Sequence, residues 1–208
     1  MSVINTLLSS LLQVFVFTLI PFIFFLFRKN KSVNFYQYTG FTTPTAKSIY
    51  IGVGTSVFFV FTGVVLALVN PGIRDIYLSE KTVTGQLHKL DISIASVTIL
   101  LCTAIFKTSL SEEILFRGFI ARQLIKKSGF KSGNLMQATI FGLVHFFLFR
   151  IQTESSLSLC IFFFLFSFVA ALLIGYNMFK NANGSIQPGW ISHGLGNTIS
   201  YFIVSFCI

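Results

Sequence analysis

Long apolar stretches separated by short polar segments run along the whole chain. Apolar residues dominate positions 4–27, 48–69, 92–107, 134–150, 157–179 and 189–207. A membrane-spanning helix needs about 20 mostly apolar residues, so this pattern predicts about six spans. Turn-forming residues such as "NPG" and "NANGSIQPG" separate them. The predicted fold class is therefore all-α, a polytopic transmembrane helix bundle.

The segment after Lys107 keeps a helical period although its charge density rises. Its apolar positions are Ile114, Leu115, Phe119, Ile120 and Leu124, and its polar positions are Glu113, Arg117, Arg122 and Lys126. This spacing predicts a second, amphipathic helix, or an extension of the third span that bends along the membrane interface. The glycines and lysines of "KKSGFKSGN" predict its end.

The composition supports a lipid environment. Hydrophobic residues make up 54% of the 208 residues and charged residues 10%, whereas about a quarter of a soluble domain is charged. The net charge of +9 does not indicate nucleic-acid binding, because the basic residues lie in separate clusters between apolar stretches. The three cysteines lie far apart within apolar stretches and suggest neither a disulfide framework nor a CxxC metal site.

The basic clusters predict how the chain is oriented. They occupy the connections at 28–47 and 117–131 and position Lys180, whereas the connection at 73–91 has balanced charge. Because basic loops tend to remain in the cytoplasm, we expect a multi-pass protein of the cell membrane with cytoplasmic basic loops and both termini outside. Residues 1–91 then form an N-terminal transmembrane region of two spans plus loops, and 92–208 form the remaining region.

Two adjacent carboxylates, Glu112 and Glu113, lie where the third span meets this charged segment. Ionisable residues in membrane segments are costly and usually face the bundle interior or a water-filled cavity. Arg117 is four residues after Glu113, so the two can form an ion pair on one helix face. Glu112 lies about 100° around an α-helix from Glu113, so we expect the two carboxylates to occupy different environments. A solvated N-terminal cap that includes Ser111 is the alternative.

Two histidines lie within later spans. His145 follows Phe141 by one turn, and His193 precedes Asn197 by one turn. Each pair alone is also consistent with helix packing. Together with Glu112, however, a neutral imidazole can deprotonate water, and a second histidine with an amide can stabilise an oxyanion. We therefore expect these residues to meet in a cavity that opens to the cytoplasm.

Three short motifs carry a resemblance to a known family. "EEILFRG" matches E-E-x-x-x-R, "FGLVH" matches F-x-x-x-H, and "HGLGN" matches H-x-x-x-N, in that order along the chain. The sequence thus resembles the CPBP family of intramembrane proteases, which includes the CAAX prenyl endopeptidases and the bacteriocin-processing or Abi-like proteins. The resemblance covers roughly 92–206, which makes 92–208 the expected protease core.

The resemblance implies roles for the matching residues. The implied catalytic residues are Glu112, Glu113, Arg117, His145, His193 and Asn197. Glu112 would be the general base, with His145 as its partner. Glu113 and Arg117 would position the site, and His193 and Asn197 would bind the oxyanion. Phe141 would line the substrate side of the cavity.

The cofactor and the substrate remain open at this point. The chain has no HExxH motif, but Glu112, His145 and His193 could bind zinc, as in a metalloprotease, so both zinc and a metal-free site are expected alternatives. The predicted function is an intramembrane endopeptidase acting on a membrane-associated peptide or protein. Six spans are fewer than the eight of the CAAX endopeptidases, so a bacteriocin or pheromone precursor is an alternative to a CAAX chain. A non-catalytic scaffold or bacteriocin self-immunity protein would use the same cavity for binding.

Overall fold

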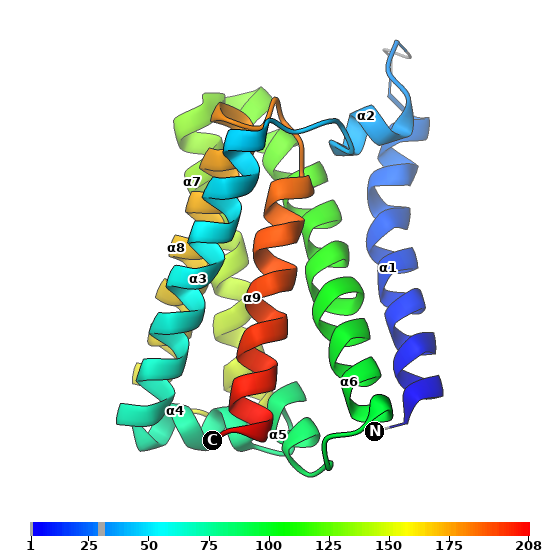
Figure 1. Cartoon of the computed structure of the whole chain (residues 1–208). Coiled ribbons are helices and arrows are strands. Elements are labelled where there is room, and N and C mark those ends of the chain that lie inside the picture. Colours follow the sequence, from blue (N-terminus) through cyan, green and yellow to red (C-terminus); the bar gives the residue numbers. More distant parts are fainter. Residues whose placement is uncertain (1, 29–31) are drawn as a thin grey trace.

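The computed structural model describes residues 2–28 and 32–208, and all regular structure in these ranges is helical, which confirms the predicted all-α class. The helices are α1 (Val3–Leu26), α2 (Phe35–Thr39), α3 (Ala46–Val69), α4 (Pro71–Leu78), α5 (Val83–His88), α6 (Ile94–Leu101), η1 (Cys102–Leu110), η2 (Glu113–Ala121), α7 (Arg122–Gln152), α8 (Leu157–Lys180) and α9 (Gln187–Phe206). The long helices run side by side and form one bundle (Figure 1).

Four helical segments are long and apolar enough to cross a membrane: Val3–Leu26, Ala46–Val69, Ile94–Gln152 and Leu157–Lys180. The third combines α6, η1, η2 and α7, and it reverses direction at Gly129, so two antiparallel arms lie in the bundle (Figure 1). Gly129 has φ 78°, a left-handed conformation that glycine adopts without steric cost. The prediction of six spans requires that both arms and the more polar α9 cross the membrane, and it remains a prediction.

The structure corrects the predicted bend along the interface after Lys107. Helical structure continues from α6 through η1 and η2 into α7 (Figure 1), because the polar groups of this stretch find partners inside the bundle. The Lys107 ammonium donates a hydrogen bond to Ser9 Oγ of α1 at 3.2 Å. Gln13 of α1 donates in turn to the Lys107 carbonyl at 2.7 Å.

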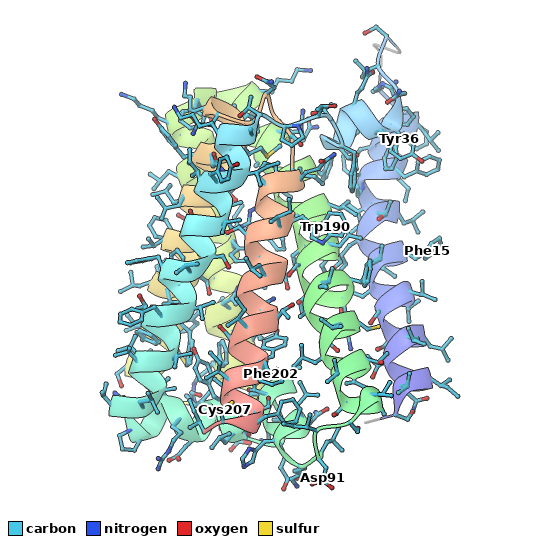
Figure 2. All side chains as sticks on the ribbon, viewed as in Figure 1. Phe15, Tyr36, Asp91, Trp190, Phe202 and Cys207 are labelled. Carbon is cyan, nitrogen blue, oxygen red and sulfur yellow. The ribbon has the colours of Figure 1, made fainter. Side chains whose placement is uncertain are left out.

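The outer surface of the bundle is apolar over long stretches. Phe15 of α1, for example, is 62% exposed and points away from the neighbouring helices (Figure 2). Phe61 and Leu68 of α3 are also exposed. Exposed apolar surface on this scale fits lipid rather than water as the surrounding solvent.

The two ends of the bundle differ in their connections. The termini, α4 and α5 lie at one end, and the connections that contain the basic clusters lie at the other (Figure 1). At the basic end, Arg122 donates a hydrogen bond to the Gly184 carbonyl, and the Ile186 amide donates to the Gly40 carbonyl at 2.9 Å. A buried apolar cluster packs below these turns; it consists of Ile114, Met178 and Ile186 with Phe41, Leu110 and Phe179 around them.

Candidate active site

The helix that carries the two carboxylates has π-helical geometry on both sides of Glu112, in η1 and η2. Hydroxyl groups bond the backbone five residues earlier within η1. Thr108 donates to the Thr103 carbonyl at 2.9 Å, and Ser109 donates to the Ala104 carbonyl at 2.6 Å. Such bonds compete with the regular helical ladder, and π-helical turns frequently occur at functional sites.

Glu113 is fully buried and has two partners. Its Oε1 atom lies 3.3 Å from Arg117 Nη1, which confirms the ion pair expected from their spacing. The same atom lies 3.3 Å from His193 Nδ1. Gly189 of α9 makes room for this carboxylate, since a Cβ there would lie 2.5 Å from Glu113 Oε2. The sequence therefore needs a glycine at this position for α9 to approach.

Arg117 is as deeply buried as Glu113 and lies against an aromatic ring. Its guanidinium carbon is 4.2 Å from the centre of the Phe141 ring, within the range of a cation–π interaction. The ring of Phe141 also lies 4.5 Å from that of His145 and 6.3 Å from that of His193. Phe141 is thus a buried ring that packs against Arg117 and both histidines.

Glu112 occupies the more open side of the site. Its side chain is 18% exposed, compared with 0% for Glu113, and it lines a cavity of about 450 Å³. Its Oε2 atom makes no hydrogen bond to any described residue. His193 Nε2 lies 3.9 Å from this oxygen. The two carboxylates therefore differ in burial and lie in different environments, as expected, although the His193 ring lies between them and approaches both.

His145 also lines the cavity, and its tautomer follows from its backbone partner. Nδ1 lies 2.9 Å from the Phe141 carbonyl oxygen. A carbonyl can only accept a hydrogen bond, so Nδ1 carries the hydrogen and Nε2 of the neutral ring keeps a lone pair. His145 also interacts electrostatically with Glu112. The neutral ring can therefore accept a proton at Nε2.

Asn197 binds the η1 segment through its amide nitrogen. Nδ2 lies 3.0 Å from Thr108 Oγ1 and 3.3 Å from Ser109 Oγ. Both hydroxyl hydrogens are already donated within η1, so both oxygens accept from Asn197. This leaves Oδ1 of Asn197 as the group available to the cavity. The predicted oxyanion contact would require one of these two bonds to be exchanged.

The sequence prediction did not include Thr108, Ser109 and Tyr201. Thr108 and Tyr201 line the cavity, and Ser109 is a buried partner of Asn197. Tyr201 could have been found from sequence, because it continues the spacing of His193 and Asn197 along α9 by one more turn. The two hydroxyls of η1 carried no such signal.

The cavity extends from Glu112 toward the end of the bundle that carries the termini. Beyond the site it is lined by Phe59 and Val64 of α3, Tyr77 of α4, Thr82 and Thr84 near α5, and Gln152 at the end of α7. The basic connections lie at the opposite end (Figure 1). The expectation that the basic loops and the cavity both face the cytoplasm remains a prediction.

Among residues 2–28 and 32–208, no group of three His, Cys, Asp or Glu side chains is arranged to hold an ion. Glu112, His145 and His193, expected as alternative zinc ligands, therefore do not fit zinc in this arrangement.

The fold and the site together define an all-helical membrane protein in which a buried carboxylate–arginine pair adjoins a cavity lined by a second carboxylate and two histidines. The family model of "Type II CAAX prenyl endopeptidase Rce1-like" proteins matches residues 94–199. The chain belongs to this family of CPBP intramembrane proteases. No curated protein and no solved structure matches the chain significantly.

Proposed function

We propose that this protease is an intramembrane endopeptidase that hydrolyses a peptide bond of a membrane-associated peptide or protein, with Glu112 as the residue that activates water. The observation that carries the proposal is the contrast between the two carboxylates. Glu113 is fully buried and is held by Arg117 and His193, whereas the Glu112 side chain is 18% exposed and lines the cavity. A base must be free to accept a proton beside its substrate.

In the first step, Glu112 removes a proton from a water molecule, and the resulting hydroxide attacks the carbonyl carbon of the scissile bond. Nε2 of His145 supports this step as a second hydrogen-bond acceptor for the water. Phe141 and the backbone contact of Nδ1 keep the His145 ring in place. Charge moves from the water to the former carbonyl oxygen, which becomes an oxyanion.

In the second step, the C–N bond breaks and the proton held by Glu112 passes to the leaving nitrogen. His193 is the candidate donor to the oxyanion. Its Nδ1 faces Glu113 at 3.3 Å, so Nε2 can donate only when the ring carries both protons. Preorganised donors at such a position stabilise the tetrahedral intermediate, and Glu112 ends the cycle as a carboxylate.

Substitution of Glu112 by glutamine and of His145 by alanine tests the proposal. We expect a membrane cleavage assay to show loss of product with both variants, and comparison of membrane-fraction proteomes with and without Glu112→Gln to reveal an accumulated precursor. The exposed Lys127, remote from the cavity, provides the control variant Lys127→Ala. Retained cleavage by both site variants at normal expression would refute the proposal and favour a non-catalytic scaffold.

A further inference from the structure

One wall of the cavity is formed by α3, which carries none of the residues assigned to hydrolysis. Those residues lie in the segment 112–117, on α7 and on α9. The family model matches residues 94–199, so it does not include α3 and assigns no role to this wall. The α3 residues that line the cavity are Thr55, Ser56, Phe59, Val60, Gly63 and Val64.

The two hydroxyl groups in the α3 wall differ in their hydrogen bonds. Thr55 Oγ1 donates to the Ile51 carbonyl at 2.8 Å. Thr62, which does not line the cavity, donates in the same way to the Phe58 carbonyl at 2.8 Å. Ser56 is only 2% exposed, yet its Oγ atom makes no hydrogen bond to any described residue. Buried polar groups are normally hydrogen-bonded, so this hydroxyl is available to a molecule in the cavity.

Ser56 lies where α3 meets α9, close to the proposed oxyanion site. A Cβ on Gly196 would lie 3.3 Å from Ser56 Oγ, and Gly196 directly precedes Asn197 in the cavity lining. One turn earlier on α3, a Cβ on Gly52 would lie 2.7 Å from the Pro188 carbonyl oxygen. The two glycines thus allow α3 and α9 to approach, and this approach places the Ser56 hydroxyl beside the turn that carries Asn197.

We propose that Ser56 is a substrate-binding residue whose hydroxyl pairs with a peptide group of the substrate main chain. A peptide in the cavity loses hydrogen bonds to water, and its N–H and C=O groups then need partners in the protein. A hydroxyl can donate to a C=O group or accept from an N–H group. The neighbouring side chains of this wall are apolar, and Thr55 is already bonded. This inference rests on the proposed hydrolysis for its substrate, but the choice of Ser56 rests on burial and geometry.

Kinetics and unfolding of the Ser56→Ala variant test this inference. The probe is the precursor that accumulates in membranes of the Glu112→Gln variant. We expect its KM to rise about 2- to 10-fold, as for the loss of one neutral hydrogen bond, with little change in kcat. The unfolding midpoint should not fall, because Ser56 Oγ bonds no described residue. The matched control Thr62→Val removes a hydroxyl outside the cavity on the same helix and should keep the KM of the parent protein.

The possible results separate this inference from the proposed hydrolysis. An unchanged KM in Ser56→Ala, with cleavage abolished in Glu112→Gln, would overturn this inference alone. A fall in the unfolding midpoint together with the rise in KM would also overturn it, because Ser56 would then act through the fold. Retained cleavage by Glu112→Gln, or the absence of an accumulated precursor, would refute the proposed hydrolysis and this inference with it.

A second measurement tests the position of Ser56 without a substrate. Ser56→Cys and the control Ser48→Cys are made in a background that lacks Cys102, Cys160 and Cys207. Ser48 is buried on the same helix but does not line the cavity. Mass spectrometry of the folded protein treated with methyl methanethiosulfonate should show faster modification of Ser56→Cys than of Ser48→Cys. Equal rates, or no modification of Ser56→Cys, would overturn the proposal.

Discussion

The sealed side of the site, around Glu113 and Arg117, and its open side, around Glu112 and His145, differ in their access to the cavity. Glu113 and Arg117 are excluded from water and lie 3.3 Å apart. Glu112 and His145 line the cavity. On the sealed side, the negative charge of Glu113 is compensated by the positive charge of Arg117. On the open side, Glu112 and His145 remain accessible to a substrate in the cavity.

This difference shows how neighbouring residues of one type acquire separate tasks. A buried ion pair adds little net stability compared with an apolar pair of the same shape, but removal of one partner leaves an uncompensated charge. Glu113 is therefore a structural requirement for the position of His193, which it contacts. Glu112 does not belong to a buried ion pair. Its substitution should therefore lower the rate of hydrolysis and have little effect on the stability of the fold.

The largest expected effect is the loss of catalytic rate in the Glu112→Gln variant. Loss of a general base lowers the rate by about 10²- to 10⁴-fold. The unfolding midpoint in detergent should stay near that of the parent protein, because Glu112 lines the cavity and does not belong to the buried ion pair of Glu113 and Arg117. Cleavage kinetics and thermal unfolding on the same preparation measure the two quantities. An equal loss of stability would show that Glu112 is structural, and the comparison of the two sides would fail.

The second expected effect is a loss of stability in Glu113→Gln, by about 3–5 kcal/mol, since Arg117 is left as a buried charge without its partner. The double variant Glu113→Gln/Arg117→Met should recover part of that loss. Unfolding free energies arranged in a double-mutant cycle measure the coupling between the two residues. A coupling close to zero would contradict the ion pair.

A smaller effect is expected from Phe141→Leu, which removes the ring beneath Arg117. The cation–π contribution is about 0.5–2 kcal/mol, and the change also loosens the ring of His145, which lies 4.5 Å away. We expect both lower stability and lower kcat, because Phe141 belongs to both sides of the site. A change in kcat alone would assign Phe141 to the open side only.

A small loss of stability is expected for Thr108→Val, because this substitution removes one acceptor of the Asn197 amide. The loss should be about 1 kcal/mol in unfolding free energy, as for a typical hydrogen bond. Thr108→Ser keeps the hydroxyl and serves as the control. Equal behaviour of the two variants would show that the hydrogen bond to Asn197 has no measurable effect on the stability of the bundle.

The smallest effect is expected at the surface pair Lys81–Glu154, near the termini end. The hydrogen bond from Lys81 and its positive charge lower the pKa of Glu154 from 4.5, so the stabilisation is present above the ordinary carboxyl pKa and is lost as pH falls through the lowered value. Unfolding midpoints of Glu154→Gln and the parent protein should differ slightly at neutral pH and converge in acid and in high salt. A difference that persists in acid would exclude the ion pair as its cause.

Part of the site could be predicted from sequence because its residues are separated by single helical turns. The spacing of Glu113 and Arg117 predicted their ion pair, which the structure confirms. The spacing of His193 and Asn197 predicted a shared helix stripe, and both line the cavity. The position of His193 between Glu112 and Glu113 was not predictable, since it depends on how closely α9 approaches through Gly189.

The helical period predicted a helix beyond Lys107, but the course of that helix through the bundle was beyond the sequence pattern. Lys107 and Glu112 looked like the end of a span, because a charged side chain is costly in lipid. The structure satisfies Lys107 with Ser9 of α1, a residue almost a hundred positions earlier in the chain. A hydropathy profile averages over neighbouring residues, so it cannot indicate a hydrogen-bond partner that is distant in sequence.

The sequence by itself determined that the chain is a helical membrane protein, that Glu113 and Arg117 pair, and to which family the three motifs belong. These properties depend on composition and on spacing within single helices, which local physics fixes. Only the tertiary structure decided which carboxylate is free, that the His193 ring lies between both, and that the cavity leads away from the basic end. Those properties depend on the contacts between helices distant in sequence, where close packing and the exclusion of water set the environment of each charge.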